Sequence, residues 1–163
     1  MSRGGNFALG LGLAVLVVAL DQATKGWMMA LLDPPRLVAL TDFFALVPVR
    51  NCGVSFGILS SCDGVTAWAL SGLALVVSVA LIVWLARAER RLLALGLGLV
   101  VGGAVGNVVD RARFGAVFDF LDFHAAGWHF PAFNLADSSI TVGVALLVLD
   151  GLLSGRGGGP ARL

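Results

Sequence analysis

The stretch GVTAWALSGLALVVSVALIVWLA, residues 64–86, contains no charged side chain over its whole length. A helix needs about 20 mostly apolar residues to cross the hydrocarbon core of a bilayer, and this run is long enough to do so. Helices of water-soluble domains usually keep a polar face, which this stretch lacks. The stretch therefore predicts a transmembrane helix.

Three further apolar runs have the same character. Residues 7–20 are uncharged, and helical character can continue through 21–25; the other two runs are 92–109 and 140–149. Together the four runs predict an all-α integral membrane protein with four transmembrane helices. We expect the spans at about 7–30, 64–86, 92–110 and 136–153.

The first run also has features of a secretory signal peptide, because Arg3 precedes an apolar segment. However, no small-x-small cleavage site precedes a polar region, and the charged Asp21 and Lys25 stand where cleavage would be expected. We interpret the run as a retained helix. Residues 1–153 are then expected to form a single four-helix domain, and residues 154–163 a disordered cytoplasmic tail.

Arginine placement predicts the orientation, because short cytoplasmic loops carry an excess of Lys and Arg. The connection between spans two and three and the two termini contain Arg87, Arg90, Arg91, Arg3, Arg156 and Arg162. This pattern predicts that both termini are cytoplasmic and that the long connections at about 33–63 and 110–136 lie outside. Fewer arginines lie on the outer side: Arg36, Arg50, Arg111 and Arg113.

The outer connections differ in composition. The first contains LVAL at 37–40 and FFALVPV at 43–49, which predict a small extracytoplasmic β-rich region on the membrane surface. The second contains Trp128, Phe130 and Phe133, aromatic residues typical of the headgroup level. Within the third span, glycines recur every four residues at 98, 102 and 106, which predicts close approach of another helix.

The composition argues against nucleic-acid binding. Hydrophobic residues make up 58% of the chain, charged residues 13%, and the net charge of +1 comes without a basic patch. Cys52 and Cys62 share one loop but have neither a metal-ligand nor a redox spacing. A disulfide can form if that loop faces an oxidising compartment, and two unpaired cysteines are the simpler interpretation.

Ionisable residues within or beside the spans are functional candidates, because an unpaired charge in hydrocarbon is costly. Asp21 and Lys25 are four residues apart, so they share one helical face; we favour a structural ion pair over a functional one. Asp110 and Asp137 are expected at the same depth, because they end and begin antiparallel spans. Asp119 lies in VFDF, 117–120, which is expected to dip back toward the membrane.

Two close aspartates can share a proton, so that one activates water and the other protonates the attacked group. Peptide hydrolysis suits such a pair. The sequence has no Ser/His/Asp order, Cys/His pair or HExxH motif, and we interpret His124 and His129 as interfacial surface residues and not as ligands. Spacing alone leaves open a proton-coupled transporter, although no inverted repeat is evident. A non-enzymatic assembly factor that uses the glycine face also stays open.

Five short motifs occur in order along the chain. They are DQATK at 21–25, RNCGVSF at 50–56, GGAVGNVVDR at 102–111, VFDF at 117–120 and WHFPAFNLADS at 128–138. Together they resemble the bacterial lipoprotein signal peptidase family, and the resemblance covers roughly residues 7 to 153.

The resemblance implies a membrane aspartyl endopeptidase of the bacterial inner membrane with its active site near the outer face. Such enzymes remove the signal peptide from diacylglyceryl-modified prolipoproteins, cutting just before the lipidated cysteine. The resemblance implies no metal and no cofactor. Expected partners are the prolipoprotein, membrane lipid and a globomycin-type inhibitor, and we expect a monomer that binds no nucleic acid.

Carried over by motif, the catalytic pair is Asp119 and Asp137. The polar positions that line the pocket and hold the substrate backbone are matched by Asn51, Asn107, Arg111 and Asn134. Asp110 is expected to orient Arg111 or a neighbouring helix through an ion pair or hydrogen bond, with Asp21 and Lys25 in support. Cys52 departs from the Pro or Arg that many members have after the loop asparagine, which bears on disulfide chemistry more than on catalysis.

Overall fold

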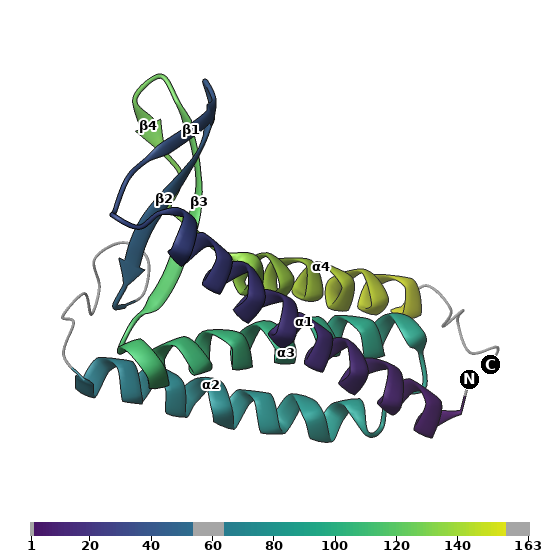
Figure 1. The fold of residues 1–163 in the computed structure, drawn as a ribbon. Coiled ribbons are helices and arrows are strands. Elements are labelled where there is room, and N and C mark those ends of the chain that lie inside the picture. Colours follow the sequence, from purple (N-terminus) through teal and green to yellow (C-terminus); the bar gives the residue numbers. More distant parts are fainter. Residues whose placement is uncertain (1, 54–63, 156–163) are drawn as a thin grey trace, which may run out of the picture.

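The computed structural model describes residues 2–53 and 64–155. These residues form α1 (Arg3–Leu31), β1 (Val38–Thr41), β2 (Phe44–Asn51), α2 (Gly64–Leu85), α3 (Arg91–Phe114), β3 (Val117–Ala125), β4 (Trp128–His129) and α4 (Leu135–Gly155). The helices lie side by side as a bundle, and the strands rise from one end of it (Figure 1). Each of the four described helices is long and apolar enough to cross a membrane, which confirms the predicted fold class.

The helices extend past the uncharged runs at their polar ends. The first begins at Arg3, where the Ser2 hydroxyl accepts a hydrogen bond from the Gly5 amide, and α3 continues to Phe114. Hydropathy locates the part of a helix that is free of charge, but not the polar turns that continue it. The division into one domain and a disordered tail stays a prediction, and residues 156–163 lie outside the described residues.

The central helix of the bundle is α3, whose apolar span is 56% buried, against 22% or less for the other three described helices. Its glycines at 98, 102 and 106 face α1. A Cβ atom at Gly102 would lie 2.7 Å from the carbonyl oxygen of Ala14, and one at Gly106 would lie 2.7 Å from Asp21 Oδ2. Only glycine allows this approach, so the predicted helix contact is confirmed and its partner is α1.

Polar contacts join the helix ends opposite the sheet. The Asn6 side-chain amide donates to the carbonyl oxygen of Ala88 at 3.2 Å, and Arg90 forms an ion pair of 2.6 Å with Asp150. Arg3 pairs with Glu89, where both side chains are largely exposed. The arginine-rich connection between α2 and α3 is therefore fixed to the start of α1 and to the end of α4.

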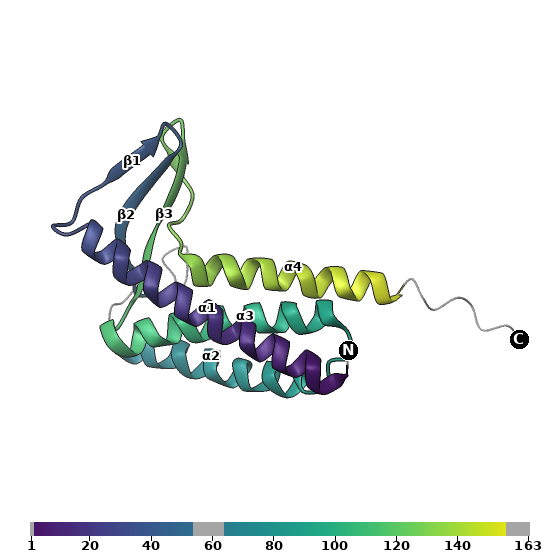
Figure 2. The ribbon, with the colours of Figure 1, turned by 45° about the vertical axis from the view of Figure 1, so that its right-hand side comes forward.

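The strands form one antiparallel sheet in the order β1-β2-β3-β4. Both long connections contribute to it, whereas the sequence predicted strands only in the first. The segment expected to dip back toward the membrane is the start of β3. In β2 the register shifts between Leu46 and Val49, around Pro48, which has no amide hydrogen to donate to a ladder. The sheet stands away from the helices at one end of the bundle (Figure 2).

A hydrophobic cluster fixes the base of the sheet to the end of α1. Its buried members are Met28, Leu32, Leu46, Phe118 and Phe120. The chain enters this cluster through Gly115, whose φ of 72° ends α3 in the left-handed conformation that glycine adopts without strain. Because the two phenylalanines flank Asp119 on β3, this packing fixes the position of that carboxylate.

The expectation of two unpaired cysteines is wrong for Cys52, which is disulfide-bonded. Cys62 lies outside the described residues, and so does the part of the RNCGVSF motif that follows Gly53.

Candidate active site

The start of α4 is held by reciprocal hydrogen bonds between Asn134 and Asp137. The Asp137 amide donates to Asn134 Oδ1 at 3.0 Å, and the Asn134 amide donates to Asp137 Oδ2 at 3.2 Å. This is a capping box with Asn and Asp in place of the more usual Ser or Thr and Glu. Asp137 therefore has a fixed position in the first turn of α4, where the helix favours a negative charge.

Asp119 lies on β3 and is 1% exposed. Its carboxylate accepts hydrogen bonds from Asn134 Nδ2 at 2.7 Å and from Asn51 Nδ2 at 3.0 Å. Burial, together with the nearby charge of Asp137, raises the pKa of Asp119 to about 7, while the two amide hydrogen bonds oppose the rise. Near neutral pH this carboxyl group can therefore either hold or release a proton.

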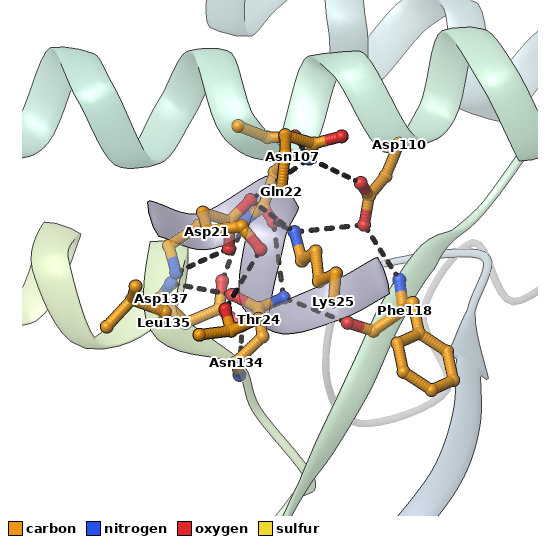
Figure 3. Close-up of polar contacts among 12 residues, drawn as sticks. Asp21, Gln22, Thr24, Lys25, Asn107, Asp110, Phe118, Asn134, Leu135 and Asp137 are labelled. Atoms are coloured by element: carbon orange, nitrogen blue, oxygen red, sulfur yellow. Dashed lines mark hydrogen bonds and ion pairs between the residues drawn. The ribbon is translucent and has the colours of Figure 1, made fainter. Parts of the chain in front are cut away.

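Asn134 connects the two aspartates. Its side-chain amide donates to Asp119, its side-chain oxygen accepts from the amide of Asp137, and its own backbone amide donates to the Asp137 carboxylate. Asp119 comes from β3 and Asp137 from α4, and Figure 3 shows Asn134 and Asp137 at the start of that helix. The structure thus brings together Asp119 and Asp137, the two aspartates predicted from the motifs.

Asp137 is partly exposed and lines a pocket of about 770 Å³. Its Oδ1 accepts a hydrogen bond of 2.8 Å from Asn107 Nδ2 on α3. The pocket is formed by the end of β2, by β4 with the segment after it, and by the first turns of α4. Its lining comprises Asn51, Trp128, Phe130, Pro131, Ala132, Phe133, Asp137, Ser138, Ile140, Thr141 and Val142.

A second polar cluster centres on Lys25, which is 1% exposed. Its Nζ lies 2.9 Å from Asp21 Oδ2 and 2.9 Å from Asp110 Oδ2, so one ammonium group is shared by two buried carboxylates. The predicted pairing of Asp21 with Lys25 is present. Asp110 also accepts a hydrogen bond of 3.1 Å from the Phe118 amide at the start of β3. Asp110 therefore connects α3 to a neighbouring helix and to the strand that carries Asp119.

Gln22 is a member of this cluster that the sequence analysis did not single out. Its side-chain amide donates to Asp110 Oδ1 at 2.9 Å and to Asp21 Oδ2 at 3.1 Å. It lies next to Asp21 in the DQATK motif, and an amide side chain within a membrane-spanning run was the available signal.

The two clusters are joined through Asn107, which accepts a hydrogen bond from Lys25 Nζ at 3.1 Å and donates to Asp137 (Figure 3). Asp21 makes a second connection, because its Oδ1 accepts a hydrogen bond of 3.0 Å from the Ala136 amide. The ion-paired cluster therefore helps to hold the start of α4, and with it the carboxylate of Asp137.

Arg111 on α3 interacts electrostatically with Asp137 and Asp119. Its side chain is partly buried, and among the described residues its Nε atom has no hydrogen-bond partner. A partly buried guanidinium beside two carboxylates is suited to bind a carbonyl oxygen of a ligand through its N–H donors.

Comparisons with known proteins identify the family of this arrangement. The family model for signal peptidase (SPase) II matches residues 13–153. The chain belongs to the signal peptidase II family. It is 47% identical over 154 residues to a lipoprotein signal peptidase of Burkholderia ambifaria (strain MC40-6), covering 94% of this chain and 93% of the relative. It is 44% identical to a lipoprotein signal peptidase of Burkholderia mallei (strain SAVP1), with coverages of 96% and 95%.

Solved structures agree with the fold of the signal peptidase II family. One bacterial membrane enzyme superposes with a TM-score of 0.81 at 28% identity, covering 96% of this chain and 94% of that one. A second gives 0.76 at 30% identity, with coverages of 89% and 93%. Family membership makes this chain a peptidase. Together with four helices capable of spanning a membrane, it indicates a multi-pass protein of the bacterial inner membrane.

Proposed function

We propose that this signal peptidase II family member cleaves the signal peptide from diacylglyceryl-modified prolipoproteins, with Asp119 and Asp137 as an aspartyl catalytic pair. The observation that carries the proposal is the pair of carboxylates joined through Asn134 beside a pocket lined largely by apolar and aromatic side chains. The names of its relatives support the substrate class.

In the proposed mechanism Asp137 begins ionised and Asp119 protonated. Asp137 takes a proton from a water molecule, and the resulting hydroxide attacks the carbonyl carbon of the scissile peptide bond. Asp119 gives its proton to the carbonyl oxygen, which produces a neutral tetrahedral diol. When this intermediate collapses, one hydroxyl proton of the diol returns to Asp119. Asp137 gives the proton that it took from water to the departing amine.

The remaining polar residues position these groups and the substrate. Asn107 and Asn134 hold the carboxylates, and the guanidinium of Arg111 donates to a backbone carbonyl of the extended peptide. Trp128 and Phe130 form a wall of the pocket above α4, where they contact the substrate from the sheet side. The lipid chains stay in the bilayer beside the helices, and a globomycin-type inhibitor competes for the same pocket.

The proposed orientation places both termini in the cytoplasm and the sheet on the outer side, because the arginine-rich connection between α2 and α3 lies at the end opposite the sheet (Figure 1). The cleavage site of an exported prolipoprotein then meets the catalytic pair at the outer face of the membrane.

A cleavage assay with the full chain in detergent or lipid tests this function. We expect a diacylglyceryl prolipoprotein to be cut immediately before its lipidated cysteine, with the released products identified by mass spectrometry. The same prolipoprotein without lipid serves as the matched control, and we expect slower cleavage because it lacks the membrane anchor. Failure to cut the lipidated protein, or a cut at another bond, would contradict the proposal.

The titration of Asp119 predicts how the rate depends on pH. Because the mechanism needs a protonated Asp119, and the pKa of this group is raised to about 7, kcat/KM falls as pH rises through about 7. The expected fall is about tenfold per pH unit on the alkaline side. Removing the Asn51 amide, which stabilises the ionised form of Asp119, raises this pKa further. Asn51→Ala therefore moves the alkaline limb to higher pH.

Rates measured from about pH 5 to 9 check this prediction. Val49→Ala is the matched control, because Val49 lies on the same strand, pairs with Asp119 and has no polar side chain. We expect its alkaline limb to coincide with that of the parent protein. An unmoved limb in Asn51→Ala would show that Asp119 is not the group that sets it.

A further inference from the structure

The hairpin formed by β3 and β4 contains both histidines of the chain and a buried aspartate. Asp122 and His124 are two residues apart on β3, so their side chains leave the same face of the strand. His129 lies on β4 directly opposite His124. The hairpin rises at the end of the sheet away from the helices (Figure 1). Asp119 is three residues before Asp122, so it leaves the opposite face of β3 and belongs to a different site.

The three side chains converge on the carboxylate of Asp122. Its Oδ2 lies 3.1 Å from His124 Nδ1 and 2.9 Å from His129 Nδ1, and the two imidazole rings stack with centroids 5.0 Å apart. One ligand atom from each residue lies within 4.8 Å of those of the other two. Around a tetrahedral zinc ion, with bonds of about 2.0–2.2 Å, neighbouring ligand atoms are about 3.3–3.5 Å apart. The two oxygen–nitrogen distances are therefore already close to that spacing.

The charge of Asp122 is otherwise poorly compensated. This residue is 5% exposed, and no lysine or arginine of residues 2–53 and 64–155 pairs with it. A buried carboxylate is costly without a cation. In the alternative arrangement, the two imidazoles only donate hydrogen bonds to Asp122 and no ion is bound.

We propose that Asp122, His124 and His129 bind a divalent transition-metal ion of the Zn²⁺ type, through both Nδ1 atoms and the carboxylate. Two imidazoles and one carboxylate are a donor set that suits such ions, and three protein ligands leave a coordination position for water. The ion bridges β3 to β4 and takes no part in peptide hydrolysis. Because Trp128 and Phe130 flank His129 and line the pocket, the ion braces the strand that forms this wall.

Isothermal titration of Zn²⁺ into the full chain tests the site. The protein is purified in detergent without a histidine tag and stripped of metal with a chelator. We expect one ion bound per chain, at least about tenfold weaker binding in His124→Gln and in His129→Gln, and no comparable binding of Mg²⁺, which prefers all-oxygen ligands. Co²⁺ provides a second readout, because its visible absorption reports nitrogen ligands in a tetrahedral site.

Glutamine is chosen because its amide can still donate a hydrogen bond to Asp122, so the hairpin can fold without offering an imidazole ligand. Asp42→Asn is the control, because Asp42 is an exposed carboxylate in the turn between β1 and β2. It should bind Zn²⁺ as the parent protein does. The proposal is overturned if the parent binds no Zn²⁺, or binds it no more tightly than the variant with both glutamine substitutions. The absorption of the parent protein with Co²⁺ tests the proposed site without relying on the folding of any variant.

Discussion

Asp119→Asn lowers the rate of prolipoprotein cleavage by at least about 10³-fold, because an amide can neither give the proton nor take it back. The substitution keeps the size of the side chain, and its amide oxygen can still accept one of the two hydrogen bonds that Asn51 and Asn134 donate, so the variant should remain folded. Single-turnover cleavage of a diacylglyceryl prolipoprotein, followed by mass spectrometry, measures the loss. Circular dichroism and thermal denaturation confirm that structure is retained.

Asp137→Asn should lose a similar factor, and the variant with both substitutions should lose little more, because residues that act as one unit are not additive. Asp42→Asn supplies the matched control: it removes an exposed carboxylate from the same sheet, and its rate should stay within about twofold of the parent. Full cleavage by Asp119→Asn would remove this residue from the catalytic pair. If Asp110→Asn then abolished cleavage while the protein stayed folded, Asp110 would take its place.

The helices were predictable because their signal is local. An uncharged run of sufficient length has few other uses, and the glycine spacing on α3 marks a face of close contact within one helix. The spacing did not identify α1 as the helix that contacts this face. Gly98 and Gly102 pack on Gly10 and Ala14 of α1, a contact between segments far apart in the sequence.

The sheet was only half predicted. FFALVPV was recognised as strand-like, whereas VFDF at 117–120 was interpreted as an apolar segment that dips toward the membrane. The strand that begins there, VFDFLDFHA, contains one valine and three phenylalanines, residue types that are enriched in strands. Its membrane-side location obscured this signal, because apolar residues are expected there in any conformation.

For the site, the motifs identified Asp119 and Asp137 as the catalytic pair, whereas the spacing of the residues did not. From spacing alone, Asp110 and Asp137 were expected at the same depth, and Asp119 was a third candidate. In the structure the carboxylate of Asp110 has other partners, because it pairs with Lys25 of α1 and accepts a hydrogen bond from the amide of Phe118. A contact between α1 and α3 cannot be read from either segment by itself. The cluster of Asp122 with the two histidines was missed for the same reason, because it depends on the pairing of β3 with β4.

Lys25→Met should lower the free energy of unfolding by about 3–5 kcal/mol, because it leaves two buried carboxylates, Asp21 and Asp110, without their shared cation. The Tm of the protein in detergent, together with denaturant titration, measures the change. Turnover should fall as well, because Lys25 holds Asn107, and Asn107 holds Asp137. As a control, Arg3→Ala breaks an exposed ion pair with Glu89 and should change the stability little.

Neutralising the whole cluster separates a structural role from a catalytic one. In the triple variant Lys25→Met, Asp21→Asn and Asp110→Asn, no buried charge is left unpaired, and the asparagine oxygens can still accept the amides of Ala136 and Phe118. We expect this variant to recover most of the lost stability, because replacing a buried ion pair with neutral groups is often close to neutral. Its turnover should stay below that of the parent, because the hydrogen bond from Lys25 to Asn107 is still absent, but within about tenfold of it, because the fold is restored. A triple variant that is stable but inactive would instead place Lys25, Asp21 or Asp110 in the chemistry, which no substitution at Asp119 or Asp137 can reveal.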